Sequence, residues 1–255
     1  MEKFTFVKVG GKIVEQEDSL QRLLRDFTAI PHRKALVHGG GRLATQLAER
    51  LGVESKVVDG RRITDEETLR IVTMVYGGLV NKNIVAGLQA LGVNALGLTG
   101  ADMNLIRSEK RPVKEVDYGY VGDVKEVNAT LLIALIRQGI VPVLAPLTHD
   151  KQGRLLNTNA DTIAGEAAKA LAGHFDVTLV YCFEKKGVLL DENDDESVIE
   201  RLDRATFREY VKQGIIRGGM IPKLENAFEA IDAGVKRVII TKASAIHSGA
   251  GTYIY

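Results

Sequence analysis

Short apolar segments alternate with amphipathic segments along the whole chain, and this alternation restricts the fold more than any other feature. Residues 4–9, 34–38 and 141–146 read as buried strands, whereas residues 19–30, 43–52 and 223–234 have apolar residues at helical spacing. Strands that alternate with helices in this way form mainly parallel sheets covered on both faces. The sequence therefore predicts an α/β fold, a three-layer αβα sandwich around a central, mainly parallel open sheet.

Local signals interrupt the alternation at defined places. "KVVDGRRIT" predicts a hairpin whose two-residue turn is Asp59-Gly60, and residues 103–127 predict a polar hairpin. A long helix is expected over residues 64–91, with Thr64 and Glu67 as its capping box and two glycines inside it. A weak boundary near Gly173 divides an N-terminal lobe, 1–173, from a C-terminal lobe, 174–255.

Composition excludes several classes of protein. The 255 residues are 45% hydrophobic with a net charge of +1 and 5% aromatic residues, which disfavours nucleic-acid and anionic-membrane partners. The single cysteine, Cys182, cannot form an internal disulfide. The N-terminus lacks a signal-peptide pattern, and Arg137, Gly139 and Pro142 break the longest apolar stretch. We expect a cytoplasmic protein with neither nucleic-acid nor membrane partners.

Two strands run directly into glycines, Gly10-Gly11 in "VKVGGK" and Gly39 to Gly41 in "LVHGGG". Ligands of open α/β sheets bind at the carboxyl ends of strands, and bare N–H groups beside a helix N-terminus hold phosphate well. Either loop alone is explained by a tight turn; the two together favour a phosphate site. His38, beside the second loop, is expected to pack at the strand end.

The same letters allow a second interpretation. "GGGRLA" matches the dinucleotide fingerprint, with Glu54 or Asp59 as the following acidic residue. The match is unspecific, because any glycine triplet with a later alanine satisfies it. No G-x-x-x-x-G-K-[ST] motif occurs, which excludes a P-loop kinase.

Charged and amide side chains accompany the glycines. Lys8 precedes the first loop by two residues and Lys223 follows another glycine pair at a helix start; each alone would read as a surface lysine. "LLNTNAD" brings Asn157 and Asp161 to a helix start, where a single capping residue would be enough. Arg62, in the predicted hairpin, could bind a carboxylate.

In this order and spacing, "VKVGGK", "LVHGGG", "DGRRIT", "LLNTNAD", "GGMIPK" and "GAGTYIY" resemble the amino acid kinase family over essentially the whole chain. The resemblance implies transfer of the γ-phosphoryl group of ATP, with Mg²⁺ held mainly by its phosphates, to the side-chain carboxylate of N-acetyl-L-glutamate in arginine biosynthesis. It implies no metal ligands from the protein. A carboxylate is already a nucleophile at neutral pH, so in-line transfer needs no general base.

The resemblance also implies roles for particular residues. The catalytic set is Lys8, Lys223 and Asp161; the substrate-binding set is Gly40, Gly41, Arg62 and Asn157; the phosphate- and ATP-binding set is Gly10, Gly11, Glu184, Gly187, Ile216 and Arg217.

The chain departs from the family pattern at two sites. "YCFEKKGVL" replaces the usual "TDVDG"-like turn, with Glu184 near the usual aspartate. Arg61 stands where relatives often have an apolar residue, which raises the alternative that the substrate is another N-acyl-glutamate, such as N-succinyl-L-glutamate. The chain begins at its first strand, without the extra helix of arginine-inhibited hexameric relatives, so we expect a homodimer without strong arginine inhibition.

Other functions remain open at this stage. Another small-molecule kinase of the family would act on aspartate, carbamate or a nucleoside monophosphate. A nicotinamide-dependent oxidoreductase would leave Lys8 and Lys223 without a role, and a non-catalytic nucleotide-binding regulator would have no reason to retain them.

Overall fold

The computed structural model describes residues 1–58, 60–246 and 249–255. An eight-stranded sheet forms its centre, with the strand order β12-β14-β13-β11-β1-β2-β8-β5. These strands are β1 Lys3–Val9, β2 Arg33–His38, β5 Ala95–Leu98, β8 Val141–Leu144, β11 Asp176–Phe183, β12 Arg201–Leu202, β13 Arg237–Lys242 and β14 Thr252–Ile254. All neighbouring pairs are parallel except β13 and β14. The predicted mainly parallel sheet is confirmed.

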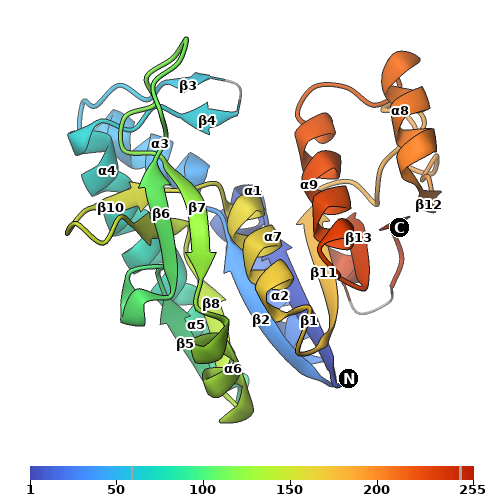
Figure 1. Cartoon of the computed structure of the whole chain (residues 1–255), viewed down its shortest axis with the longest axis horizontal. Helices are drawn as coiled ribbons and strands as arrows, with labels where there is room; N and C mark the ends of the chain where they lie inside the picture. The colour runs from blue at the N-terminus through green and yellow to red at the C-terminus, as the bar shows by residue number, and fades with distance from the viewer. Residues whose placement is uncertain (59, 247–248) are drawn as a thin grey trace.

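Helices cover both faces of the sheet, as Figure 1 shows for α7 and α9 on one of them. The helices are α1 Gly11–Glu15, α2 Glu17–Thr28, α3 Gly41–Arg50, α4 Glu66–Val72, α5 Asn81–Ala90, α6 Ala129–Arg137, α7 Ala160–Leu171, α8 Arg204–Lys212 and α9 Met220–Asp232. Short 3₁₀ turns lie at η2 Asp102–Asn104 and η3 Ala243–Ala245. Two hydrophobic clusters fill the spaces between the layers, one on each face.

Strand β1 shows how the alternation of the sequence builds the two clusters. Phe4 and Phe6 point into the cluster beneath α6, α7 and α9, whereas Val7 and Val9 point into the cluster beneath α2, α3 and α5. Lys8 continues the row of Phe4 and Phe6, because side chains two residues apart in a strand share a face. The sequence thus places one cation at the end of an otherwise apolar row.

Smaller elements extend from the sheet. β6 Ile106–Lys110 and β7 Gly122–Val127 pair antiparallel, which confirms the polar hairpin, and join β9 Leu147–His149 and β10 Leu155–Asn157 in a four-stranded sheet. β3 Val57–Val58 pairs antiparallel with β4 Arg61–Arg62, which confirms the predicted β3–β4 hairpin. Its turn residue Asp59 lies outside the described residues.

The long helix differs from its prediction in two respects. Thr64 does not cap it: its hydroxyl donates to the carbonyl of Arg62, and Asp65 caps the helix by accepting from the Thr68 amide. Between α4 and α5 the eight residues Thr73–Val80 form a π-helix, η1. The run Glu66–Ala90 is long and apolar enough to cross a membrane by length and composition alone, a test that core helices also pass, and 44% of its apolar window is buried in the protein.

The proposed boundary at Gly173 stays a prediction. It falls between α7 and β11, and the central sheet continues across it because β1 pairs with both β2 and β11.

His38 ties the central sheet to the long helix. The Asn81 side-chain amide donates to Nε2 of His38 and to the Val143 carbonyl. Nδ1 of His38 donates to the Gly39 carbonyl. The imidazole is therefore neutral, and complete burial lowers its pKa from 6.5 to about 4. The expected packing role at the strand end is what the structure shows.

The free energy of unfolding should fall as the pH drops from about 6.5 to about 4. In that window His38 is protonated in the unfolded chain but stays neutral in the folded protein. The slope is at most ~1.4 kcal/mol per pH unit, or about 3 kcal/mol in all. Urea unfolding at several pH values measures it. His38→Gln should lose this part of the pH dependence, whereas His174→Gln, at an exposed site, should keep it. Equal pH dependence in His38→Gln and the unchanged protein would contradict the assignment.

Candidate active site

The buried ion pair between Lys8 and Asp161 is the centre of the site. Lys8 Nζ lies 2.6 Å from Asp161 Oδ1, and the two side chains are 8% and 11% exposed. Asp161 is at the start of α7, where Asn159 caps the helix by accepting from two backbone amides. The third polar residue of "NTNAD", Asn157, donates to the Thr64 hydroxyl. The three residues therefore have separate roles: Asn157 binds Thr64, Asn159 caps α7 and Asp161 pairs with Lys8.

Lys223 comes from the other end of the chain to the same place. It lies in the second turn of α9, and its Nζ is 3.9 Å from the centre of the Phe183 ring. Lys8 Nζ is 5.4 Å from the same ring. Burial lowers the pKa of Lys223, and the Lys8 charge lowers it further, whereas Asp161 raises it. Two ammonium groups thus lie near one carboxylate and one aromatic ring.

The glycine loops, Lys223 and Glu184 line a cavity of about 440 Å³, here called the lysine cavity. Its lining includes Gly10, Gly11, Gly41, Phe183, Glu184, Gly187 and Lys223. The two glycine loops touch: a Cβ added at Gly11 would lie 3.5 Å from the amide nitrogens of both Gly40 and Gly41. The backbone of both glycine loops and the Lys223 ammonium group therefore border one space, which suits a polyanion.

A second cavity of about 400 Å³ lies beside the β3–β4 hairpin and is here called the hairpin cavity. Gly40, Gly41, Arg61, Arg62, Tyr76 and Asn157 are among its lining residues. Arg62 is held on three sides, since it donates to the Gly41 carbonyl, the Thr45 hydroxyl and the Ser55 hydroxyl at 2.7 Å each. Gly41 borders both cavities, so groups bound in them would meet there.

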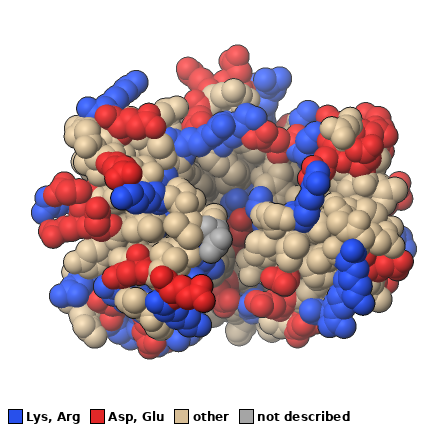
Figure 2. Space-filling view, turned by 90° about the horizontal axis from the view of Figure 1, so that it is seen from above, with Lys and Arg blue, Asp and Glu red and all other residues tan. Residues whose placement is uncertain are grey.

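The remaining residues that the sequence predicts to bind ATP lie further out. Gly187, Ile216 and Arg217 line a third cavity of about 340 Å³, next to the lysine cavity through the shared Gly187. Arg217 is exposed and its Nη2 lies 2.5 Å from Glu192 Oε2. Figure 2, seen from above, shows a hollow near the middle of this face with Lys and Arg along its rim.

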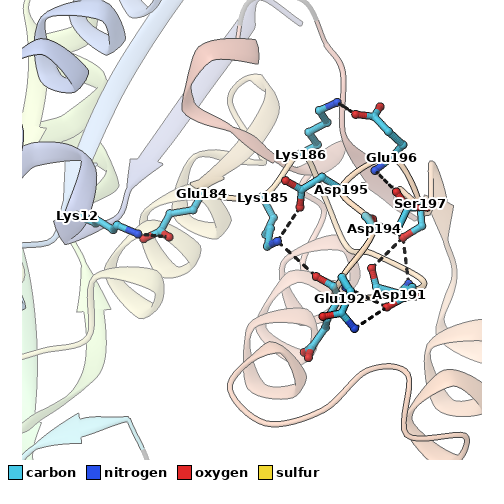
Figure 3. A network of polar contacts seen from close by, with 11 residues as sticks. Lys12, Glu184, Lys185, Lys186, Asp191, Glu192, Asp194, Asp195, Glu196 and Ser197 are labelled. Atoms are coloured by element: carbon cyan, nitrogen blue, oxygen red, sulfur yellow. Dashed lines mark hydrogen bonds and ion pairs between the residues drawn. The ribbon is translucent and has the colours of Figure 1, made fainter.

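The unusual turn after β11 has its own charge network, drawn in Figure 3. Glu184 pairs with Lys12 at 2.5 Å, Lys185 pairs with Asp195 at 2.6 Å, and Lys186 pairs with Glu196. These pairs are half exposed, so each contributes little to stability. Together they fold the acidic segment 191–196 back over the two lysines and leave Glu184 pointing toward α1.

Other chemistry finds little support in the described residues. No three His, Cys, Asp or Glu side chains among them gather as a metal site. Cys182 is fully buried, and burial raises the pKa of its thiol, which suppresses the reactive thiolate.

Sequence reasoning did not find every lining residue. Tyr76, Thr45 and Ser55 surround Arg62, and Phe183 lies beneath the two lysines. Tyr76 sits in an apolar helical row and reads as core, so the sequence alone offers no signal for it.

Parallel strands whose glycine loops meet between two adjoining cavities, with Lys223 in the wall of one, define a protein suited to move a phosphoryl group between two small molecules. The chain belongs to the amino acid kinase family, whose model matches residues 3–242. It is 77% identical over the full length of both chains to an acetylglutamate kinase of Parabacteroides distasonis. It is 74% identical to an acetylglutamate kinase of Phocaeicola vulgatus, covering 99% of this chain and 98% of the relative.

Among solved structures, smu.665 from Streptococcus mutans has a TM-score of 0.82 at 29% identity, covering 98% of each chain. Kinase membership replaces the oxidoreductase alternative raised by "GGGRLA".

The Lys8–Asp161 pair predicts a strongly non-additive mutant cycle. Lys8→Met or Asp161→Asn should each lose about 3 kcal/mol of unfolding free energy, because each leaves an uncompensated buried group or charge. The double variant should lose less than the sum of the two. Urea unfolding measures all three. Lys56→Met, which breaks the exposed pair with Glu54, serves as the control and should change little. Additive losses at Lys8 and Asp161 would contradict a coupled pair.

Proposed function

We propose that this protein is an ATP-dependent kinase that phosphorylates the side-chain carboxylate of N-acetyl-L-glutamate to an acyl phosphate, in arginine biosynthesis. The observation that carries the proposal is the meeting of the lysine cavity and the hairpin cavity at Gly41. Curated acetylglutamate kinases at up to 77% identity over the full length support it.

The proposed binding mode assigns one reactant to each cavity. N-acetyl-L-glutamate binds in the hairpin cavity, with its α-carboxylate on Arg62 and Asn157 and its side-chain carboxylate at the Gly40 and Gly41 amides. The triphosphate binds in the lysine cavity against Gly10 and Gly11, with Glu184 at its border. The nucleoside part extends toward Gly187, Ile216 and Arg217. Lobe 1–173 thus holds the acyl amino acid and lobe 174–255 most of the nucleotide.

The chemistry follows from charge. An oxygen of the substrate carboxylate attacks the γ-phosphorus in line, and the bond from that phosphorus to the β-γ bridging oxygen breaks, releasing ADP. Lys8 and Lys223 stabilise the charge on the phosphoryl group in transit, and Asp161 positions both lysines. The site offers cations and N–H groups, so Mg²⁺ would enter with the nucleotide and be held mainly by its phosphates.

The proposal extends to assembly and location. Met74 and Leu79, each 52% exposed, give the long helix an apolar surface, which supports a homodimer through that helix. We place the enzyme in the cytoplasm, where ATP and amino-acid precursors occur.

Trapping the product with hydroxylamine tests the reaction. The protein with Mg·ATP, N-acetyl-L-glutamate and hydroxylamine should form a hydroxamate, and Lys223→Met should lower kcat by about 10²–10³ because one preorganised cation is lost. Lys236→Met, an exposed lysine elsewhere in the same lobe, should keep full activity. Absence of hydroxamate from folded protein with either N-acetyl- or N-succinyl-L-glutamate would refute the proposal.

Arg61 favours a second candidate substrate. It is half buried in the wall of the hairpin cavity, and its pKa is lowered first by burial and then by the charge of Arg111. Asp123 pairs with Arg111, at 2.5 Å, and no carboxylate among the described residues lies within ion-pair distance of Arg61. A cation with no ion-pair partner among the described residues, at the wall of a substrate cavity, suits an extra carboxylate, as in N-succinyl-L-glutamate.

Comparing the two acyl-glutamates decides between them. If the succinyl compound is the substrate, Arg61→Leu should lower its kcat/KM by about 10–100-fold, the loss of one charged hydrogen bond. Turnover of N-acetyl-L-glutamate should barely change, and Arg50→Leu, at an exposed site on α3, should affect neither compound. Indifference of both compounds to Arg61→Leu would remove Arg61 as the residue that reads the acyl group.

A further inference from the structure

We propose that Tyr76 is a substrate-positioning residue of the hairpin cavity, whose hydroxyl donates a hydrogen bond to a carboxylate of the bound acyl-glutamate. The inference rests on the proposed function and adds a residue to it. Tyr76 is 5% exposed, lies in η1 and lines the hairpin cavity.

Two contacts place the two ends of this side chain. A Cβ added at Gly40 would lie 2.9 Å from Cδ1 and 3.1 Å from Cε1 of Tyr76, so the ring packs against the Gly40 backbone. A Cβ added at Gly41 would lie 4.0 Å from the Tyr76 hydroxyl and 3.9 Å from Arg62 Nη2. The hydroxyl and the guanidinium therefore flank Gly41 on the same side, at the junction of the two cavities.

The π-helix explains how a residue of a core row comes to line a cavity. Buried residues recur every four positions along the long helix, at Thr68, Val72, Tyr76, Val80, Ile84 and Leu88. Four residues turn an α-helix by about 40° more than one full turn, so such a row drifts around the axis. The wider turn of a π-helix rotates less per residue and reverses the drift. The row stays on one side of the helix, and Tyr76 faces the Gly40-Gly41 loop.

The hydrogen bonds that Arg62 already makes leave room for a second hydrogen-bond donor to a bound carboxylate. Three of its five N–H groups are already directed to the Gly41 carbonyl, Thr45 and Ser55. An incoming carboxylate can accept about four hydrogen bonds, and at most two N–H groups of Arg62 are left for it. A neighbouring phenol provides one more.

The protonation state suits a donor. Burial raises the pKa of Tyr76, and the charge of Arg62 and its hydrogen bond to the phenol only partly offset this. The phenol therefore keeps its proton at neutral pH. Among the residues that the structure describes, none accepts a hydrogen bond from this hydroxyl, so its O–H is available to a ligand in the hairpin cavity.

The simpler interpretation is that Tyr76 only packs against Gly40. The variant Tyr76→Phe distinguishes packing from substrate positioning, because it keeps the ring and removes the hydroxyl. Steady-state kinetics with each acyl-glutamate, together with calorimetric binding of the same compound, should show KM and Kd raised about tenfold. The KM for ATP and the melting temperature should stay within twofold and about 1 °C of the unchanged protein.

Two further variants complete the test. Tyr76→Leu, which removes the ring as well, should also lower kcat and the melting temperature, since the Gly40 backbone loses its support. Tyr255→Phe, at an exposed C-terminal residue, is the matched control and should change nothing.

The outcomes separate the two proposals. An unchanged KM and Kd in Tyr76→Phe, with damage only in Tyr76→Leu, would overturn the inference and reduce Tyr76 to packing. If the unchanged protein binds an acyl-glutamate but forms no hydroxamate, the proposed reaction fails while the Kd ratio still decides the role of Tyr76. If it binds neither acyl-glutamate, both proposals are refuted.

Discussion

The ion pair between Lys8 and Asp161 is the interaction on which the rest of the site depends. Two charges that are about nine-tenths buried are tolerable only together, because either one alone would face an apolar environment without compensation. The pair fixes the start of α7 against the end of β1. The Phe183 ring lies beside both Lys8 and Lys223, and Phe183 and Lys223 line the lysine cavity together with residues of both glycine loops. The ion pair is thus a structural restraint, and the proposed function assigns its lysine a catalytic charge as well.

Much of this arrangement can be predicted from the sequence because its signals are local. The two-residue period of "FTFVKV" places Lys8 opposite Val7 and Val9, and the glycines that follow mark the end of a strand at the ligand-binding edge. Three amide or carboxylate residues in "NTNAD" exceed the needs of one cap, and the structure gives the surplus to Thr64 and Lys8. The β3–β4 hairpin is recognisable for the same reason, since its signal lies in neighbouring residues.

What the sequence does not show depends on contacts between distant segments. Thr64 and Glu67 match a capping box, but the hydroxyl of Thr64 is drawn to the carbonyl of Arg62 and Asp65 takes over the cap. The π-helix has no sequence signature, because it depends on how the buried residues of the long helix pack against the rest of the core. The closeness of Tyr76 to Gly40, 36 positions away, follows only from that geometry. The three-dimensional meeting of the two cavities at Gly41 is likewise a product of packing.

The position of β1 in the sheet has a consequence for how the protein is made. Residues 3–9 leave the ribosome before the other strands of the sheet, yet their strand lies in the middle of the sheet and pairs on one side with β11, residues 176–183. At about 5–20 residues per second, synthesis of the intervening segment takes roughly 10–30 s. During that time one edge of an apolar strand has no native partner, which is the situation in which nascent chains aggregate or recruit chaperones. Lys8 interrupts the apolar run of that strand. Its charge therefore also disfavours aggregation of the strand before Asp161, its partner in the folded protein, has been synthesised.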